Sequence, residues 1–324
     1  MSRVLVVGGA NLDQTAVAAR LPGSGETVLA TEYRETPGGK AANVASAAAA
    51  WGADVTFVGR VGDDGFGDTL LSAWAEAGVD TSHVRRDAAG TGLGIVFLDH
   101  QGRYQTIVVP RANARLSECD VEALPASLWA EVGALALALE APIPATLGAA
   151  RAAATRGRPV VLNAAPAEGM DPALWPLVTH LVVNEHEAAL LAGAPVDDAA
   201  SAVPAAEALL ARLAPERAAA VIVTLGATGA VLGRPGRPAR NVPAPRVSAV
   251  DTLGAGDTFV GVLVAEVAAG HDLDAAVDLA CAAGAAAVTI TGARAAVTPA
   301  RARALRQDAE QNQAGATRPE GAFA

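Results

Sequence analysis

Short runs of β-branched residues alternate along this chain with alanine-rich segments, and this alternation limits the possible folds more than any other feature. The runs with the length of buried strands lie at 4–7, 55–61, 160–163, 181–183 and 219–225. Segments with the length and composition of helices lie at 41–51, 68–77, 117–129, 143–156 and 273–289. Strands that alternate with helices form parallel sheets covered on both faces. The sequence therefore predicts an α/β fold with a central, mostly parallel, doubly wound sheet flanked by helices.

The composition agrees with one large domain. A chain of 324 residues can bury a sizeable core, and 52% of these residues are hydrophobic. Aromatic residues make up only 3% while alanine is abundant, so we expect small side chains where helices pack together. We assign residues 1–308 to this domain. The polar stretch 309–324 is expected to be a disordered tail.

The charge and the cysteines exclude several classes of function. The net charge is -10, from 24 basic and 34 acidic residues, which opposes binding to nucleic acid or to an anionic membrane. Only Cys119 and Cys281 occur, so neither a disulfide framework nor a cysteine metal site is indicated, and a cytoplasmic location is expected. The N-terminal apolar run stops at Gly8 without a cleavage pattern, which indicates a buried strand rather than a secretion signal.

Two segments that are far apart in the sequence have the pattern of a small separate sheet. The stretch 21–34 alternates loosely between apolar and polar residues and follows turn residues. The runs 92–98 and 104–109 flank Asp99-His100-Gln101-Gly102, which is typical of a β-hairpin. We expect these segments, within about 12–36 and 91–112, to form a discontinuous β lid over the end of the first strand.

The stretch AVDTLGAGDTFVGVLV, from Ala249 to Val264, combines a glycine loop with the start of an apolar helix. Gly254, Ala255 and Gly256 can turn consecutive N–H groups toward one point, as anion-binding loops at helix starts do. Asp257 would place a carboxylate beside a bound phosphate and could orient an attacking hydroxyl. Alternatively, the glycines form a tight turn and Asp257 only complements the helix dipole.

A second glycine loop, Pro37-Gly38-Gly39-Lys40, opens an alanine-rich helix that carries Asn43 in its first turn. The helix dipole disfavours a lysine at this end. A nearby anion or hydroxylated ligand would explain Lys40, although a solvated lysine is the alternative.

Polar side chains follow several predicted strands, at the edge where open α/β sheets bind ligands. Asn11 and Asp13 come after the first strand, where an ordinary Asx turn is equally consistent, and Glu140 ends the apolar run GALALALE. Asn184 and Glu187 are three residues apart and could orient a phosphate-bound magnesium ion. The same spacing also fits a capping box.

Five strings occur in the order found in one enzyme family: GGK with Asn43, VGRVGDDGFG, VVNEHE, VTLGATG and DTLGAGDTF. On these strings the chain resembles the ribokinase-like, phosphofructokinase B type carbohydrate kinases over roughly residues 3–305. Within that family the segments NLD, PGSGETV, RANARLS, LALALEAP and LNAAPA are most similar to those of kinases that act on ribose.

The resemblance implies a reaction, its cofactors and its site residues. It implies transfer of the γ-phosphoryl group of ATP to a primary sugar hydroxyl, with O5 of D-ribose favoured, ribose 5-phosphate as product, and Mg2+ and K+ as cofactors. Other sugars or nucleosides, such as fructose, 2-keto-3-deoxygluconate or adenosine, are alternatives. It also implies a homodimer formed through the β lid. The implied sugar-binding residues are Asn11, Asp13, Gly39, Lys40, Asn43 and Glu140.

The same resemblance assigns Asp257 as the base and the amides of Gly254, Ala255 and Gly256 as the anion hole. It assigns Asn184 and Glu187 to the magnesium phosphate end, Thr224, Gly226 and Gly229 to the nucleotide, and Asp251 with Gly292 to a potassium site. We expect the helix N-terminus to lower the pKa of Asp257 and make it a weak base.

The chain departs from the family pattern at a few positions. GGKAANVA replaces the usual GGKGANQA, Ala296 stands where a serine is usual near the monovalent cation, and Cys281 stands where a histidine often flanks adenine.

Two other functions agree with part of this pattern. An α/β dehydrogenase is disfavoured because the first glycines lack the GxGxxG turn. A non-catalytic sugar or nucleotide sensor is disfavoured by the presence of Asp257.

Overall fold

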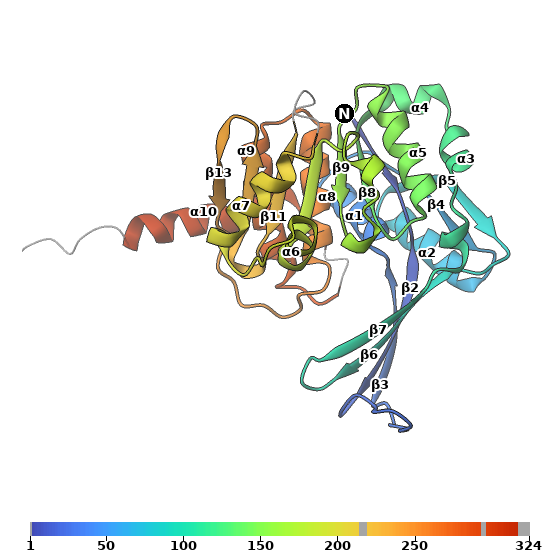
Figure 1. Cartoon of the computed structure of the whole chain (residues 1–324). Coiled ribbons are helices and arrows are strands. Elements are labelled where there is room, and N and C mark those ends of the chain that lie inside the picture. The colour runs from blue at the N-terminus through green and yellow to red at the C-terminus, as the bar shows by residue number, and fades with distance from the viewer. Residues whose placement is uncertain (1, 214–218, 293–295, 317–324) are drawn as a thin grey trace, which may run out of the picture.

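The computed structural model describes residues 2–213, 219–292 and 296–316, with side chains described as far as residue 308. Within these ranges the chain forms a nine-stranded sheet in the order β13-β12-β11-β10-β9-β8-β1-β4-β5 and a separate four-stranded sheet in the order β3-β2-β6-β7. Figure 1 shows the small sheet projecting from the larger body.

The large sheet is mostly parallel, as predicted. Its parallel strands are β1 (Arg3–Val7), β4 (Val55–Gly62), β5 (Val79–Asp87), β8 (Val132–Ala138), β9 (Val160–Asn163), β10 (His180–Asn184) and β11 (Ala220–Thr224). The hairpin β12 (Ala230–Arg234) and β13 (Arg237–Val242) extends one edge with antiparallel pairs. Strand β1 lies between β4 and β8, so Val6 is paired with both Phe57 and Ala136.

Helices cover both faces of this sheet. One core contains residues of α1 (Lys40–Ala50), α2 (Gly65–Glu76), α8 (Ala255–Ala268), α9 (Leu273–Ala287) and α10 (Pro299–Ala316). The other contains residues of α3 (Glu118–Glu122), α4 (Ala126–Glu131), α5 (Ile143–Ala154), α6 (Glu185–Ala192) and α7 (Ala199–Leu210). Strand β1 supplies Val4 and Val6 to the first core and Leu5 and Val7 to the second, because successive side chains of a strand point to opposite faces.

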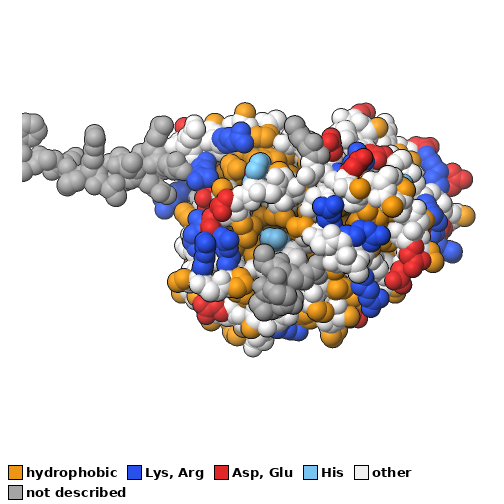
Figure 2. All heavy atoms as spheres, turned by 90° about the horizontal axis from the view of Figure 1, so that it is seen from above, with side chains coloured by type: hydrophobic (Ala, Val, Ile, Leu, Met, Phe, Trp, Pro, Cys, Tyr) orange, Lys and Arg blue, Asp and Glu red, His pale blue; other side chains and the backbone are white. Residues whose placement is uncertain are grey.

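Short 3₁₀ helices connect several elements: η1 (Arg111–Arg115), η2 (Ala167–Gly169), η3 (Pro172–Leu174) and η5 (Gly226–Thr228). Among the described residues no helix is both long and apolar enough to cross a membrane. Seen from above, Figure 2 shows acidic and basic side chains interspersed over that face rather than gathered into one surface of a single sign.

Small residues bring the helices of the first core close together, as the composition predicted. Gly261 of α8 lies against α1, where an added Cβ would be 2.6 Å from the Cβ of Ala47. Gly8, just after β1, is equally close to α1, since its added Cβ would be 2.3 Å from the Cβ of Ala41. These contacts hold the start of α1 beside β1 and its middle beside α8, and this arrangement builds the site described below.

The small sheet consists of β3 (Glu32–Gly38), β2 (Asn11–Ala18), β6 (Gly92–Asp99) and β7 (Tyr104–Val109), which confirms the predicted separate sheet. We refer to these strands as the lid. The first lid strand along the chain, β2, starts at Asn11, directly after the short loop that follows β1. Strand was also predicted from residue 21, but regular pairing of that segment begins only at Glu32, because Pro22, Gly23 and Gly25 favour turns.

Two other boundaries differ from the predictions. The single helix expected over 117–129 is two helices, since Pro125 ends one and precedes the other. The tail was expected to be disordered from 309, but α10 continues to Ala316. Its alanine, glutamine and glutamate residues favour helix despite their polarity. Residues 317–324 of that tail lie outside the described residues.

Candidate active site

The predicted site residues gather where strands of the large sheet end and α1 and α8 begin. Glu140 lies just beyond β8, Asn184 ends β10 and Thr224 ends β11. Asn11 starts the lid after β1, while Lys40 and Asp257 lie in the first turns of α1 and α8. The carboxyl edge of a doubly wound sheet is the usual ligand site of such folds.

Asp257 is the buried carboxylate at the centre of this arrangement, and Asn43 holds it. The Nδ2 of Asn43 donates a 2.8 Å hydrogen bond to Oδ2 of Asp257. The Oδ1 of the same amide is buried and has no hydrogen-bond partner among the described residues. A buried amide oxygen without a partner is costly, so Asn43 offers an acceptor that a substrate hydroxyl could satisfy.

The pKa of Asp257 is raised rather than lowered, so the prediction of a low-pKa carboxylate was wrong. Burial disfavours the charged form and outweighs both the attraction of Lys40 and the hydrogen bond from Asn43. The prediction considered the helix dipole without the loss of water around the side chain. A raised pKa makes Asp257 a stronger base than expected.

The glycine loop before α8 leaves amides available beside Asp257. Gly254 is the N-cap residue with a φ of 74°, a left-handed conformation that favours glycine. The N–H of Ala255 bonds weakly to the carbonyl of Thr252 at 3.4 Å. The amides of Gly254 and Gly256 have no partner among the described residues. Two of the three predicted donors are therefore free to bind an anion at this helix start.

Glu140 and Lys40 meet at the start of α1. The Oε2 of Glu140 accepts a 2.8 Å hydrogen bond from the backbone N–H of Lys40, while Gly39 before it has a φ of 94°. Burial acts to lower the pKa of the Lys40 ammonium, but the carboxylates of Asp257, Glu140 and Glu187 raise it overall. Lys40 is therefore a partly buried lysine whose ammonium interacts electrostatically with three carboxylates.

Asp13 lies on the lid strand β2 between two glycines. An added Cβ on Gly38 of β3 would lie 2.0 Å from Oδ2 of Asp13, and an added Cβ on Gly94 of β6 would lie 2.1 Å from Oδ1 of Asp13. Burial, followed by the repulsion of Glu140 and Asp257, raises the pKa of Asp13 to about 7. The contribution of Gly94 was missed from the sequence, because the predicted lid specified neither the order of its strands nor the register that places Gly94 beside Asp13.

Asn184 and Glu187 form the capping box that was the alternative interpretation. The Asn184 Oδ1 accepts from the Glu187 amide at 2.8 Å, and the Glu187 Oε2 accepts from the Asn184 amide at 2.9 Å. Burial is the main cause that raises the pKa of Glu187, and Lys40 opposes it. The capping box therefore also holds a buried carboxylate that interacts electrostatically with Lys40.

The residues predicted for the nucleotide lie around the end of β11. Thr224 donates from Oγ1 to the carbonyl of Val183 at 3.3 Å, and Gly226 and Gly229 both have positive φ. Gly229 lies so close to β13 that an added Cβ would be 2.0 Å from the carbonyl oxygen of Val242. The thiol of Cys281 donates to that same carbonyl at 3.8 Å, and burial raises its pKa to about 12.

The structure also brings together the two residues predicted to bind a monovalent cation. The N–H of Gly292 donates to Oδ2 of Asp251 at 2.9 Å, and the N–H of Leu253 donates to Oδ1 at 2.9 Å. Ala296 is exposed, and residues 293–295 between them lie outside the described residues. No group of three His, Cys, Asp or Glu side chains suited to a metal occurs in the described part of the chain.

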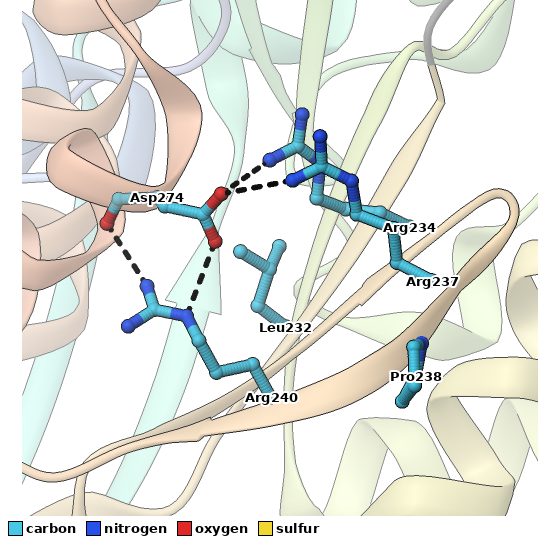
Figure 3. A pocket seen from close by; sticks show the side chains of 6 residues that line it. All are labelled: Leu232, Arg234, Arg237, Pro238, Arg240 and Asp274. Carbon is cyan, nitrogen blue, oxygen red and sulfur yellow. Dashed lines mark hydrogen bonds and ion pairs between the residues drawn. The ribbon is translucent and has the colours of Figure 1, made fainter.

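A cavity of about 390 Å³ lies elsewhere, between the β12–β13 hairpin and α9. Figure 3 shows Arg234, Arg237 and Arg240 converging on Asp274, with Leu232 and Pro238 as the apolar lining. Arg234 and Arg240 contact this carboxylate at 2.6 and 3.1 Å. These ion pairs join the hairpin to α9, and none of the predicted site residues lines the cavity.

Comparison with known proteins gives the same assignment over nearly the whole chain. Residues 1–301 match the model of the pfkB family carbohydrate kinases. A ribokinase of Haemophilus influenzae is 34% identical over 301 residues, which is 93% of this chain and 96% of that protein. A ribokinase of Mus musculus is 35% identical over 264 residues, 80% of each chain.

A solved structure agrees in three dimensions. The structure of Arabidopsis thaliana ribokinase complexed with ribose and ATP superposes with a TM-score of 0.83 at 28% identity, covering 94% of this chain and 99% of that one. The predicted α/β fold with its separate small sheet is thereby confirmed. On the family match and these relatives, the chain belongs to the pfkB family of carbohydrate kinases.

Proposed function

We propose that this protein is an ATP-dependent kinase that phosphorylates O5 of D-ribose to give ribose 5-phosphate. The observation that carries the proposal is the buried Asp257 carboxylate, held by Asn43 beside free amides at the start of α8. The relatives named ribokinase favour ribose over the other sugars and nucleosides that the same loop could accept.

In this mechanism the sugar hydroxyl attacks the γ-phosphorus of ATP, a bond to phosphorus forms, ADP leaves, and the hydroxyl proton passes to Asp257. Phosphoryl transfer depends mostly on positioning and on stabilising charge. The amides of Gly254 and Gly256 would bind the transferred group, while Ala255 would complete the turn. Lys40 would offset the negative charge that Asp13, Glu140 and Asp257 place around the sugar.

The sugar would be held by Asn11, Asp13, Gly39, Lys40, Asn43 and Glu140. The unsatisfied Oδ1 of Asn43 supports this assignment, because it needs a donor such as a sugar hydroxyl. We further propose that Thr224, Gly226 and Gly229 line the site of the nucleotide, whose adenine would lie toward Cys281.

Two cations belong to the proposal. Magnesium bound to the phosphates would neutralise their charge, with Asn184 and Glu187 at that end; a buried carboxylate there suits a hard cation. Potassium would be held near Asp251 and Gly292. The Asp251 oxygens fit such a role because each accepts one amide bond and keeps a further lone pair.

The lid is proposed to join two copies of the chain. Its outermost strand β7 exposes Tyr104 and Val108 on one face, with 70% and 53% of each residue accessible, and Ile107 on the other face, with 58% accessible. Exposed apolar side chains on an outer strand are typical of an interface. We also propose that residues 1–308 act as one domain with this discontinuous lid, and that the enzyme works in the cytoplasm, where its free Cys119 and Cys281 would stay reduced.

An ADP-release assay over pentoses, hexoses and nucleosides, with and without K+, tests the proposal. We expect selective turnover of D-ribose, stimulation by K+, and a product phosphorylated at O5 by ³¹P and ¹³C NMR. A preference for nucleosides or hexoses would overturn the choice of ribose. Binding of sugar and ATP without ADP release would instead support a non-catalytic sensor.

A further inference from the structure

Asn113 is a buried amide that lies 102 residues away in sequence from Asn11 and bonds to it directly. It is part of η1, which follows the lid strand β7. Its Oδ1 accepts from the backbone N–H of Ala10 at 3.0 Å, and its Nδ2 donates to the carbonyl of Ala10 at 2.9 Å. The same Nδ2 donates to Oδ1 of Asn11 at 2.8 Å.

These bonds leave only one orientation for each of the two amides. The backbone N–H of Ala10 can only donate and its carbonyl can only accept, so the oxygen and nitrogen of Asn113 cannot exchange places. The Nδ2 of Asn113 must then face an acceptor, which fixes Oδ1 of Asn11 against it. Asn11 is left with its Nδ2 donor, which bonds to no described residue.

The same place is the root of the lid. Strand β2 begins at Asn11, strand β6 begins at Gly92, and η1 follows β7. An added Cβ on Gly92 would lie 2.3 Å from Nδ2 of Asn113 and 2.5 Å from Oδ1 of Asn11, so the backbone of β6 closes over this bond. Asn113 therefore links the loop after β1 with the starts of two lid strands.

We propose that Asn113 is a positioning residue that fixes Asn11 as a hydrogen-bond donor toward the sugar and anchors the lid at its root. The inference rests on the proposed function for the identity of the ligand. It predicts that Asn113 affects sugar binding through Asn11, and that its bonds to the backbone of Ala10 anchor the lid.

The first test is a double-mutant cycle on the Kd of D-ribose, measured by calorimetry. Asn113→Asp keeps the acceptor for Ala10 but replaces the donor, so Asn11 should turn its own nitrogen inward and present an oxygen to the sugar. We expect the Kd to rise about tenfold or more, the effect of one lost buried polar contact. kcat at saturating ribose should change less than the Kd.

In an Asn11→Ala background the same Asn113→Asp change should raise the Kd less than twofold further, because the group it acts through is gone. An equal rise in both backgrounds would overturn the inference, as would a Kd of Asn113→Asp within twofold of wild type. If the substrate screen selects another sugar, the cycle is measured with that sugar.

Thr179→Val is the matched control. The Thr179 hydroxyl accepts from the N–H of Val160 at 2.8 Å and donates to its carbonyl at 3.0 Å, as the Asn113 amide does for Ala10. This contact lies at the amino ends of β9 and β10, away from the carboxyl ends of the strands where the candidate site lies. We expect this variant to lose thermal stability and to keep the wild-type ribose Kd.

Hydrogen exchange without sugar tests the anchor independently of the proposed function. The Ala10 amide should exchange slowly in wild type, faster in Asn113→Ala, and near the wild-type rate in Asn113→Asp, which keeps the acceptor. Equal Ala10 exchange in wild type and Asn113→Ala would overturn the anchor even if ribose is the substrate. Absence of ribose turnover by wild type, with the expected exchange pattern, would count against the proposed function alone.

Discussion

The amide nitrogen of Asn43 and a carboxylate oxygen of Asp257 lie 2.8 Å apart, although 214 residues separate them in the sequence. The bond joins the first turn of α1 to the first turn of α8. The two helices approach closely because Gly261 meets Ala47 without a side chain between them. The loop that starts with Gly38 and the loop that ends with Asp257 are therefore parts of one site.

Removing Asn43 should shift the pH dependence of the reaction. Its hydrogen bond lowers the pKa of Asp257, although burial keeps that pKa above its ordinary value. In Asn43→Ala the carboxylate would therefore protonate at a higher pH. We expect the acidic limb of the kcat/KM profile to move to higher pH, with a lower plateau. A limb at the wild-type pH would show that this bond does not tune the base.

Asp13→Asn should stabilise the free protein at neutral and alkaline pH. The folded pKa of about 7 lies above the ordinary value of 3.8. The native state therefore binds the proton more tightly, and Asp13 contributes stability that is complete below pH 4 and lost as the pH rises through 7. We expect Asp13→Asn to raise the free energy of unfolding at pH 8 by up to about 4 kcal/mol.

That gain should shrink as the pH falls toward 4, while ribose binding weakens at every pH. Urea unfolding between pH 4 and 8 measures the difference. A variant less stable than wild type at pH 8 would contradict the assignment of a destabilising carboxylate.

Gly94→Ala should weaken sugar binding by displacing the Asp13 carboxylate. The added Cβ would lie 2.1 Å from Oδ1 of Asp13, and the short aspartate side chain cannot move toward Gly38 on its other side. We expect the KM for ribose to rise at least about tenfold while the KM for ATP stays within twofold. Gly65→Ala is the control, because its Cβ would meet nothing within 4 Å. Equal effects on both KM values would argue against a local role.

Ile107→Lys should separate the proposed dimer. The substitution replaces an exposed apolar side chain of the outer strand β7 with a charge, whose burial in an interface would be costly. Light scattering after size exclusion should give a dimer for wild type and a monomer for the variant. Leu190→Lys, at a comparably exposed apolar residue on α6, should remain a dimer. A wild-type monomer at high protein concentration would contradict the lid interface.

Much of the fold could be predicted because its signals are local. Runs such as Val160–Asn163 and the glycines before Lys40 and Asp257 have a recognisable pattern within a few residues. Pro125 is a local signal for a helix boundary, but the helical composition on both sides of it favoured a single helix over 117–129. The continuation of α10 past residue 308 was missed because the polar composition of this stretch is also typical of disordered chains.

The parts of the site that were missed depend on pairings between distant segments. Asp13 faces Gly94 because β2 and β6 pair in parallel with these two residues in register. Asn113 and Ala10 are also far apart in the sequence and meet only in the folded chain. Short motifs carry no information about such contacts. The predicted direction of the pKa shift of Asp257 was also wrong, because burial is a property of the packed structure and outweighs the effects of Lys40 and of the Asn43 hydrogen bond.

The central claim is that Asp257 removes the proton from the sugar hydroxyl, and Asp257→Asn tests it most directly. The amide keeps the shape of the side chain but cannot accept that proton. With saturating ATP and D-ribose, we expect kcat to fall by about 10²–10⁴-fold while calorimetry still detects ribose binding within a few-fold of wild type. A kcat within a few-fold of wild type would contradict the account.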